Sequence, residues 1–339
     1  MPHDHDGPTT KADCLNRLYR ALYEDEAQGG EYRMVLLHDA EDMVDPTALA
    51  LLDEALDSAE FVQLPVRPEP QADSRWVAGH YLEEFTEAHA KAMVVRDAMG
   101  AALPAAGVGC AFARPVLARV AAERPDREGP FSVESLTEDY ELGLRLKQLG
   151  ARARFLRLRG TDGRLVATRA CFPAELRAAV RQKTRWIHGI ALQGWDRLGW
   201  TARPIELWMR FRDRRGPLTA IVLAAGYLLL LVAGLLWLAG VAGLGRPWQP
   251  AQLVRSLSPD NFAGFAWRAA MPFAFTANEY GCVEGLRAVL RIPLANLVAI
   301  LAGRRALFAY MRTLGGKQPR WDKTVHRAHP ALMQGARAA

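Results

Sequence analysis

The sequence predicts an α/β domain followed by transmembrane and interfacial helices. Three observations support this fold class: strand-like and helix-like segments alternate over residues 1–215, a long uncharged apolar run follows them, and the remaining residues mix apolar stretches with arginines. We therefore divide the chain into four parts. These are the α/β domain at 1–215, which ends in an amphipathic interface helix, a transmembrane helix at 216–245, a second span with an interfacial helix at 246–303, and a basic cytoplasmic tail at 304–339.

The overall composition excludes several classes of protein. Of the 339 residues, 50% are hydrophobic and 24% are charged, which excludes a disordered or collagen-like chain. The formal net charge is +6, but the arginines cluster beside the apolar run, where anionic lipid headgroups account for them. We therefore expect no nucleic-acid partner. The four cysteines lie far apart without C-x-x-C spacing, so a zinc finger is not expected.

Local patterns and capping residues define the elements of the α/β domain. The run Tyr32–Leu37 predicts a buried strand, and Asp45 with Pro46 supplies the N-cap and first position of a helix that reaches about Ala59. Two further strands are predicted at Phe61–Pro65 and Ala151–Leu158. Helices are predicted at Leu82–Met99, at the end of the segment Val133–Leu149, where Gly150 stops the helix, and at Pro173–Leu198, which is long and amphipathic.

The apolar run Leu218–Leu244 carries no charged residue and predicts a transmembrane helix. Such a helix is about 40 Å long at 1.5 Å per residue, which exceeds the roughly 30 Å hydrocarbon core of a bilayer. Arginines precede the run at 210, 212, 214 and 215, whereas only Arg246 follows it closely. The positive-inside rule therefore places the α/β domain in the cytoplasm.

The apolar signal is weaker after this run. Phe262–Tyr280 contains charged and amide residues, and Pro272 is expected to kink a helix there. The uncharged stretch Ile292–Gly303 is too short to cross a bilayer. We expect one imperfect returning span and an amphipathic helix in the interface, followed by a basic tail from Arg304, and the number of crossings stays open.

The first candidate site lies directly after the strand Tyr32–Leu37. Carboxylates at the C-terminal end of a strand lie where open α/β sheets bind ligands. Side chains two residues apart on an extended chain point to the same side. Asp39 and Glu41 could therefore hold together a divalent cation that bridges a nucleotide diphosphate. The alternative is an ordinary acidic loop in which Asp45 only caps the next helix.

The second candidate site is the segment Ser135–Glu141. A carboxylate fixed at the start of a helix, such as Asp139, is a suitable general base for a hydroxyl nucleophile. The alternative is a helix start in which Thr137 is the N-cap and the acidic residues interact favourably with the helix dipole.

The third candidate site lies on the helix Pro173–Leu198. Gln182, Arg185 and Trp186 share one face, and Gly189 on the same face would leave room for a ligand. Trp186 can stack on a sugar ring while Arg185 contacts phosphate. The alternative is an interfacial helix whose tryptophans lie at headgroup level, which also explains Trp195 and Trp200.

These motifs, D-x-E, T-E-D and Q-x-x-R-W, followed by a membrane span, resemble in their order those of processive family 2 glycosyltransferases, which include cellulose, hyaluronan and poly-N-acetylglucosamine synthases. The resemblance covers residues 7–245 and implies a GT-A (Rossmann-like) fold. It is closest to the inner-membrane bacteriophage adsorption protein B group, which shares the stretches GPTTKADCLN, HDAEDMVDP, LTEDYELG, RQKTRWIHGIALQGW and RWDKTVH.

The resemblance implies a donor site and a metal site. Asp39 and Glu41 would bind a divalent cation, Mg²⁺ or Mn²⁺, and the donor diphosphate, with Asp42 as an alternative metal ligand. Lys11 would lie near the donor, and Arg185 would contact the pyrophosphate leaving group. The metal and Arg185 would stabilise the charge that develops on the departing diphosphate.

The resemblance also implies a catalytic base and an acceptor site. Asp139 would deprotonate the acceptor hydroxyl, with Glu138 beside it, and Gln182 and Trp186 would hold the acceptor sugar. The family begins with about three further strands that carry the uridine pocket, and this sequence starts after them. We therefore expect an N-terminally incomplete GT-A domain whose sheet has an open edge.

The implied function is that of an inverting hexosyltransferase in the bacterial inner membrane, with a cytoplasmic catalytic domain. It would transfer a sugar from a nucleotide sugar to a growing glycan in envelope or exopolysaccharide synthesis. Its partners would be the nucleotide-sugar donor, the glycan acceptor, the lipid bilayer and envelope-export proteins. The alternative is a non-catalytic inner-membrane scaffold or phage-adsorption component derived from a truncated glycosyltransferase.

Overall fold

A computed structural model describes residues 9–124, 128–201, 203–244 and 251–317 of the chain. Its main sheet has four strands in the order β1 (Met34–Leu37), β4 (Cys110–Ala113), β2 (Phe61–Gln63) and β5 (Ala153–Phe155). Strand β4 is antiparallel to β1 and β2, and β2 is parallel to β5. A second sheet pairs β3 (Val66–Pro68) with β6 (Thr168–Ala170) in parallel. Strand β1 forms one edge of the main sheet.

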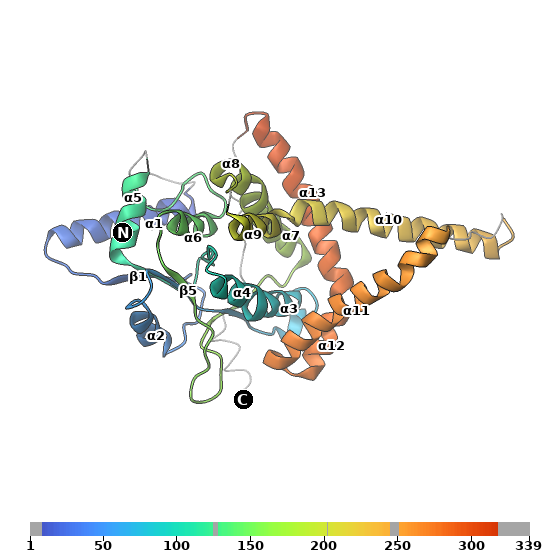
Figure 1. Ribbon diagram of the computed structural model, residues 1–339, viewed down its shortest axis with the longest axis horizontal. Helices are drawn as coiled ribbons and strands as arrows, with labels where there is room; N and C mark the ends of the chain where they lie inside the picture. The colour runs from blue at the N-terminus through green and yellow to red at the C-terminus, as the bar shows by residue number, and fades with distance from the viewer. Residues whose placement is uncertain (1–8, 125–127, 202, 245–250, 318–339) are drawn as a thin grey trace.

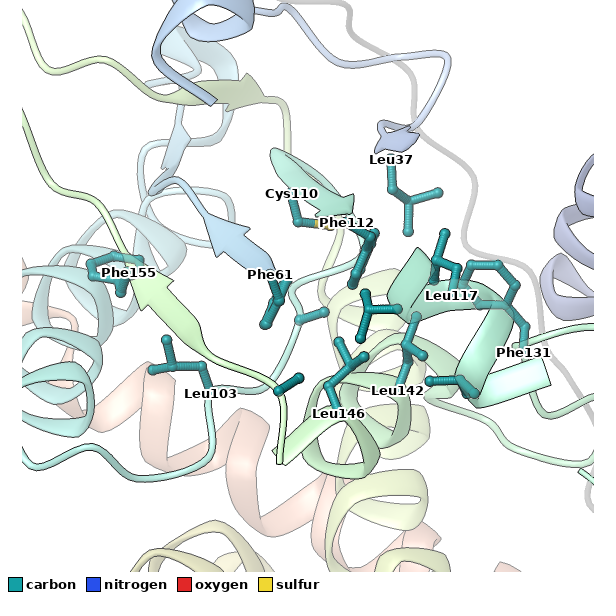
Figure 2. Packing of buried hydrophobic residues seen from close by; sticks show 14 of the residues in the cluster. Leu37, Phe61, Leu103, Cys110, Phe112, Leu117, Phe131, Leu142, Leu146 and Phe155 are labelled. Carbon is teal, nitrogen blue, oxygen red and sulfur yellow. The ribbon is translucent and has the colours of Figure 1, made fainter. Parts of the chain in front are cut away.

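Alternate residues of the central strands build two apolar cores. Phe61 and Phe112 stack at 5.0 Å between ring centroids and face Leu142 and Leu146 on one side of the sheet (Figure 2). Their neighbours on β2 and β4 point to the opposite side, because side chains alternate along a strand, and pack against Leu52 and the rest of α2. The sheet is therefore covered on both faces, which confirms the predicted α/β domain (Figure 1).

Helices surround the sheets, and two of them continue through π-helical segments. The helix predicted at Leu82–Met99 is observed as one continuous run, and so is most of the one predicted at Pro173–Leu198. The bounds are α1 (Lys11–Ala27), α2 (Ala48–Ala55), α3 (His80–Glu87), η2 (Ala88–Ala92), α4 (Met93–Ala98), α5 (Arg114–Glu123), α6 (Glu138–Gln148), α7 (Leu176–Trp186), η3 (Ile187–Gln193), α8 (Gly194–Leu198) and α9 (Pro204–Arg214), together with the 3₁₀ turn η1 (Ala72–Ser74).

The start of α2 differs from the prediction. The Asp45 carboxylate accepts hydrogen bonds from the Thr47 backbone N–H at 3.0 Å and from its hydroxyl at 2.7 Å. This local turn keeps residues 45–47 out of the helix, so α2 begins at Ala48 and its N-cap is Thr47. The prediction that Asp45 is the N-cap was therefore wrong by two residues.

The chain after residue 215 forms long helices. They are α10 (Gly216–Val241), α11 (Gln252–Tyr280), α12 (Cys282–Leu290) and α13 (Ile292–Leu314). Among the described residues, α10 and α13 are long and apolar enough to cross a membrane, with mean hydropathies of 2.5 and 1.4 in their most apolar windows. None of that window in α10 is buried against the protein, and Figure 1 shows α10 projecting away from the domain.

Helix α11 is a single element that contains Pro259 and Pro272, and the expected kink at Pro272 stays a prediction. One expectation about these helices was wrong. Helix α13 does not stop at Gly303 but continues to Leu314, because Arg304 and Arg305 remain helical on its exposed side. The boundary at residue 303 therefore falls inside a helix, and residues 318–339 of the basic tail, with the RWDKTVH stretch, lie outside the described residues.

Helix α13 attaches the C-terminal helices to the domain. Its buried Val298 and Ala302 pack against Val180 of α7. Gly303 lies so close to Ala220 that a β-carbon at this position would collide with the Ala220 methyl group. Helix α13 therefore runs across the base of α10 and connects it to α7, the helix that carries the Q-x-x-R-W motif (Figure 1).

Candidate active site

A single cavity of about 290 Å³ lies between the loop after β1, the N-termini of α1 and α6, and helix α7. All the site residues predicted from the sequence line this cavity. They are Lys11, Asp39, Glu41, Asp42, Glu138, Asp139, Gln182, Arg185 and Trp186. The structure thus brings the three candidate sites together, although they are far apart in the sequence.

The loop after β1 supplies the acidic end of the cavity. The Asp42 N–H donates to the Asp39 carbonyl oxygen at 3.1 Å, which closes a turn at the end of the strand. The period-two argument was therefore wrong, because Asp39 and Glu41 lie in a turn and not on a strand. Burial, followed by the nearby Asp39 carboxylate, raises the pKa of Asp42 to about 7.

Lys11 connects the acidic loop to the other carboxylates of the cavity. Its ammonium group donates to Asp39 Oδ1 at 2.5 Å and to the Gly107 carbonyl oxygen at 3.4 Å. Burial alone would lower the pKa of Lys11, but the charges of Asp39 and Asp139 raise it above its ordinary value. Lys11 is therefore a cation held between the acidic loop and the start of α6.

Asp139 lies in the first turn of α6 and is tightly held. Its Oδ1 accepts a hydrogen bond from the Tyr140 backbone N–H at 2.7 Å. On the other side is Gly107, with a φ of +76°, where any β-carbon would collide with Asp139 Oδ2. Burial raises the pKa of Asp139 above its ordinary value, although Lys11 opposes this shift. A fixed carboxylate with a raised pKa is a stronger base than an ordinary aspartate, which suits it to accept a proton.

Glu138 lies beside Asp139 and is more deeply buried, with 5% of its surface exposed. Burial and the adjacent Asp139 raise the pKa of Glu138. Lys11 and Arg185 oppose this shift, so both cations influence both carboxylates of α6.

Thr137 is the N-cap residue of α6, as one interpretation of the sequence had it, whereas Gly189 does not have the role that the sequence suggested. Thr137 occupies the N-cap position of α6, but its side chain makes no capping hydrogen bond. It packs instead against Gly189 of η3, where a β-carbon would lie 2.5 Å from Thr137 Oγ1 and 2.7 Å from Cγ2. Gly189 therefore allows η3 to approach α6, and it does not leave room for a ligand as the sequence suggested.

Helix α7 supplies the third side of the cavity. Gln182 is 4% exposed, and its Oε1 is buried without a hydrogen-bond partner among the described residues. An unsatisfied buried acceptor of this kind is suited to bind a hydroxyl group of a ligand. Trp186 packs edge-on against Tyr81, with 6.3 Å between ring centroids, and the Lys183 ammonium lies 5.3 Å from the Trp186 ring centroid.

Sequence reasoning missed an aromatic wall beside Trp186. Phe85 of α3 and Phe172, which follows β6, also line the cavity, and their ring centroids are 4.6 Å apart. Phe85 lies one helical turn after the buried Tyr81, a spacing that could have indicated a shared face. Phe172 had no comparable signal, because only the pairing of β3 with β6 brings it to the cavity. Trp195 and Trp200 do not line this cavity.

The family model described as "Glycosyl transferase family group 2" matches residues 34–244, which include all of the site except Lys11. The chain belongs to this family. It is also 32% identical over 352 aligned residues to bacteriophage adsorption protein B of Escherichia coli K12 and to bacteriophage N4 adsorption protein B of Escherichia coli O157:H7. Each alignment covers 94% of this chain and 46% of the relative, so the chain spans about half the length of these proteins. The family resemblance seen in the sequence is thereby confirmed.

The carboxylates of this family 2 site suit a divalent cation that is shared with a phosphate ligand. Asp39, Glu41 and Asp42 offer oxygen ligands, which Mg²⁺ and Mn²⁺ prefer. Within the described residues, no group of three or more Asp, Glu, His or Cys side chains is arranged to hold a metal ion. Mg²⁺ commonly uses one or two carboxylates together with substrate phosphates. The residues therefore fit a cation bound jointly with a diphosphate.

Gly189→Ala should disturb the family 2 site, although Gly189 itself does not line the cavity. The new β-carbon would press on the stiff, β-branched Thr137 and displace the start of α6. We expect a loss of about 1–3 kcal/mol in the free energy of unfolding, and a loss of about 10- to 100-fold in the rate of glycosyl transfer. Gly216→Ala is the control, because its β-carbon would meet Ile187 at an ordinary 3.6 Å. Equal behaviour of the two variants would contradict the prediction.

Proposed function

We propose that this chain is a membrane-bound inverting glycosyltransferase of the hexosyltransferase type. It transfers a sugar from a nucleotide sugar, a UDP-sugar, to a growing glycan in envelope or exopolysaccharide synthesis. The observation that carries this proposal is the convergence of the acidic loop, the start of α6 and the Q-x-x-R-W face of α7 on one cavity. Membership of a glycosyltransferase family supports it, whereas an ordinary acidic loop or helix start would not require this convergence.

In the proposed reaction, the acceptor hydroxyl loses its proton to Asp139 while its oxygen forms a bond to the anomeric carbon of the donor. The bond from that carbon to the diphosphate breaks at the same time, UDP leaves, and the configuration inverts. The Gln182 Oε1 accepts a hydrogen bond from the acceptor sugar, and the Trp186 ring packs against it. The Tyr140 N–H and Gly107 hold the Asp139 carboxylate in place for the proton transfer.

The leaving diphosphate gains negative charge, which the cations of the cavity stabilise. Lys11 and Arg185 both line the cavity, and Lys11 is already placed beside Asp39. Asp39 and Glu41, with Asp42 as the alternative, would hold the divalent cation. When bound, the cation supplies further charge stabilisation at the diphosphate oxygens.

We propose further that α10 crosses the bacterial inner membrane and that the catalytic domain lies in the cytoplasm. The exposed apolar surface of α10 supports this, because no part of its most apolar window is buried against the protein. The basic residues at the end of α9 precede it, in agreement with the positive-inside rule. A glycan made on this side must cross the bilayer, so envelope-export proteins are the proposed partners.

The direct test is the release of UDP from UDP-sugars by membranes of cells that express the chain. Membranes with the chain should release UDP when an acceptor glycan is added, and matched membranes without the chain should not. Equal release by both would contradict the proposed activity and favour the non-catalytic scaffold or phage-adsorption component.

Removal of divalent cations should abolish UDP release. A cation shared with the diphosphate has too few protein ligands to resist a chelator, so EDTA should reduce the rate to background and added Mg²⁺ or Mn²⁺ should restore it. Calorimetric titration should show that Mn²⁺ binds more tightly when UDP is present. Full activity in excess EDTA would exclude a role for the cation.

A further inference from the structure

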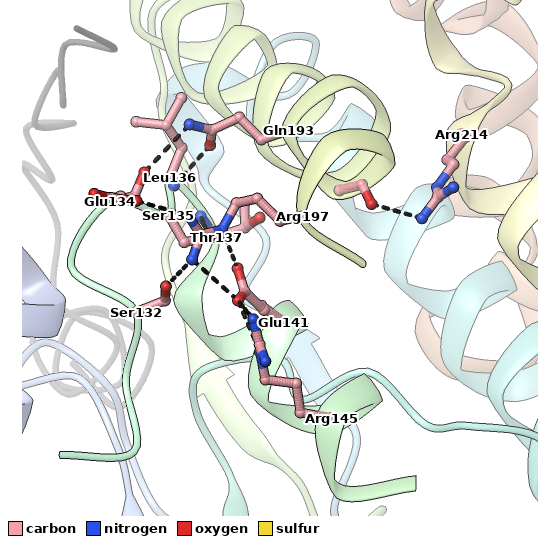
Figure 3. A network of polar contacts seen from close by, with 11 residues as sticks. Ser132, Glu134, Ser135, Leu136, Thr137, Glu141, Arg145, Gln193, Arg197 and Arg214 are labelled. Carbon is pink, nitrogen blue, oxygen red and sulfur yellow. Dashed lines mark hydrogen bonds and ion pairs between the residues drawn. The ribbon is translucent and has the colours of Figure 1, made fainter. Parts of the chain in front are cut away.

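The loop that precedes the catalytic helix α6 is held by the segment that follows the Q-x-x-R-W motif. Gln193, the last residue of η3, accepts a hydrogen bond from the Leu136 backbone N–H at 3.0 Å and donates one to the Glu134 carbonyl oxygen at 3.2 Å. Gln193 is buried, with 7% of its surface exposed, and its side chain points at the loop (Figure 3). The backbone of residues 134–136 is therefore fixed by one side chain from a distant helix.

Arg197 of α8 extends this contact along the same loop. It donates to Glu141 Oε2 at 2.8 Å and to Glu134 Oε2 at 2.9 Å, and it also contacts Ser132 (Figure 3). Arg145 donates to Glu141 as well, at 2.9 Å, but this pair lies within α6. Burial would raise the pKa of Glu141, but Arg197 and Arg145 hold it below its ordinary value, so Glu141 is a charged partner.

These contacts connect the two halves of the site. Segment η3 continues directly from α7, which carries Gln182 and Trp186, and the loop held by Gln193 leads directly into Asp139. A π-helical segment inside an α-helix is rare and is frequently found at functional sites. Here it turns both Gly189 and Gln193 toward the start of α6.

We propose that Gln193 is a positioning residue, which fixes the distance and direction of Asp139 relative to the acceptor sugar held by α7. This inference rests on the proposed function, because it assigns Asp139 as the base. Gln193 does not line the cavity, so it acts through the loop and not on the substrate. A displacement of about 1 Å in a reacting group can cost about 100-fold in rate.

The test compares Gln193→Met with the wild-type full chain in membranes. Methionine is close to glutamine in length and volume, so it keeps the packing and removes both hydrogen bonds. We expect kcat for UDP release to fall about 10- to 100-fold, while KM for the UDP-sugar and the Kd for UDP stay within about twofold because the donor side is untouched. Amide hydrogen exchange should increase in residues 134–140 only. Gln193→Glu keeps the acceptor for the Leu136 N–H, so its kcat should lie between the two.

The control is Arg145→Gln, which removes an ion pair from the same network but leaves Glu141 with Arg197. It should retain the wild-type kcat. A wild-type kcat in Gln193→Met, or a parallel loss of kcat, UDP affinity and thermal stability, would overturn the inference and leave the proposed function standing. A wild-type chain that releases no UDP would overturn the proposed function and this inference with it.

Discussion

Asp139→Asn should reduce the rate of UDP release in the presence of acceptor by about 10³-fold, which is typical for the loss of a general base. Asparagine has nearly the same shape, and its oxygen can keep the hydrogen bond from the Tyr140 N–H. The variant therefore loses the proton acceptor and little else. Initial rates with wild-type and variant membranes at matched protein levels measure the effect, and the Kd for UDP should change little.

Glu138→Gln is the matched control for the base. Glu138 lines the same cavity and belongs to the same helix turn, but its carboxylate interacts with its own backbone N–H, whereas the Tyr140 N–H holds that of Asp139. We expect a loss of about tenfold or less, since Glu138 acts only through its charge. If Glu138→Gln is inactive while Asp139→Asn retains the wild-type rate, the assignment of the base is wrong.

The raised pKa of Asp139 predicts the pH dependence of this rate. Only the deprotonated carboxylate can accept the acceptor proton, so kcat/KM falls as the pH falls through the pKa of the free protein. Burial shifts that pKa upward, so the acidic limb should lie above the ordinary range of about 4 for an aspartate. The limb should be absent from the residual activity of Asp139→Asn.

The sequence was sufficient to predict the residues of the cavity because their order and spacing are a family property. It also predicted the α/β class, since β1 and the helices on either side of the sheet have strong local patterns. Helix α1 was missed although Thr10 and Asp13 form a reciprocal capping box at its start. This box could have been recognised from the T-x-x-D spacing alone.

Other features could not be predicted because they arise only from contacts between distant segments. From the sequence, the missing side chain of Gly189 was interpreted as space for a ligand. Only the packing of η3 on α6 shows that Thr137 occupies this space. The sequence around Gly107 did not indicate that a glycine is required there, because the space for a side chain at this position is taken by the distant Asp139 carboxylate. The length of α13 was underestimated because Arg304 and Arg305 interrupt the apolar pattern, although both are exposed and remain helical.

Arg291→Met should be the most destabilising single substitution that leaves the cavity intact. The Arg291 side chain is completely buried at the start of α13, where it donates to Glu83 of α3 at 2.8 Å, to Glu284 of α12 at 2.6 Å and to the Arg75 carbonyl oxygen at 3.0 Å. Removing one partner of a buried ion pair leaves an uncompensated charge and typically costs about 3–5 kcal/mol. We expect a loss of this size in the free energy of unfolding, measured by denaturant titration in detergent.

The loss should depend on pH through Glu83. Burial raises the pKa of Glu83 to about 7 even though Arg291 opposes the shift, and loss of Arg291 would raise it further. An acid whose pKa is raised by folding stabilises the folded state while it is protonated, and this stability is lost as the pH rises through the folded pKa. The destabilisation of Arg291→Met should therefore be larger at pH 8 than at pH 6.

The double variant Glu83→Gln, Arg291→Met tests whether the buried charge is the cause. It removes the Glu83 carboxylate that loses its partner in the single variant, so it should recover part of the lost free energy of unfolding. Arg287→Met is the matched control, because Arg287 also pairs with Glu284 but is 37% exposed, and exposed pairs typically contribute about 1 kcal/mol or less. A cost for Arg291→Met as small as that for Arg287→Met would mean that apolar packing of α13 on α7, and not this ion pair, holds the C-terminal helices to the domain.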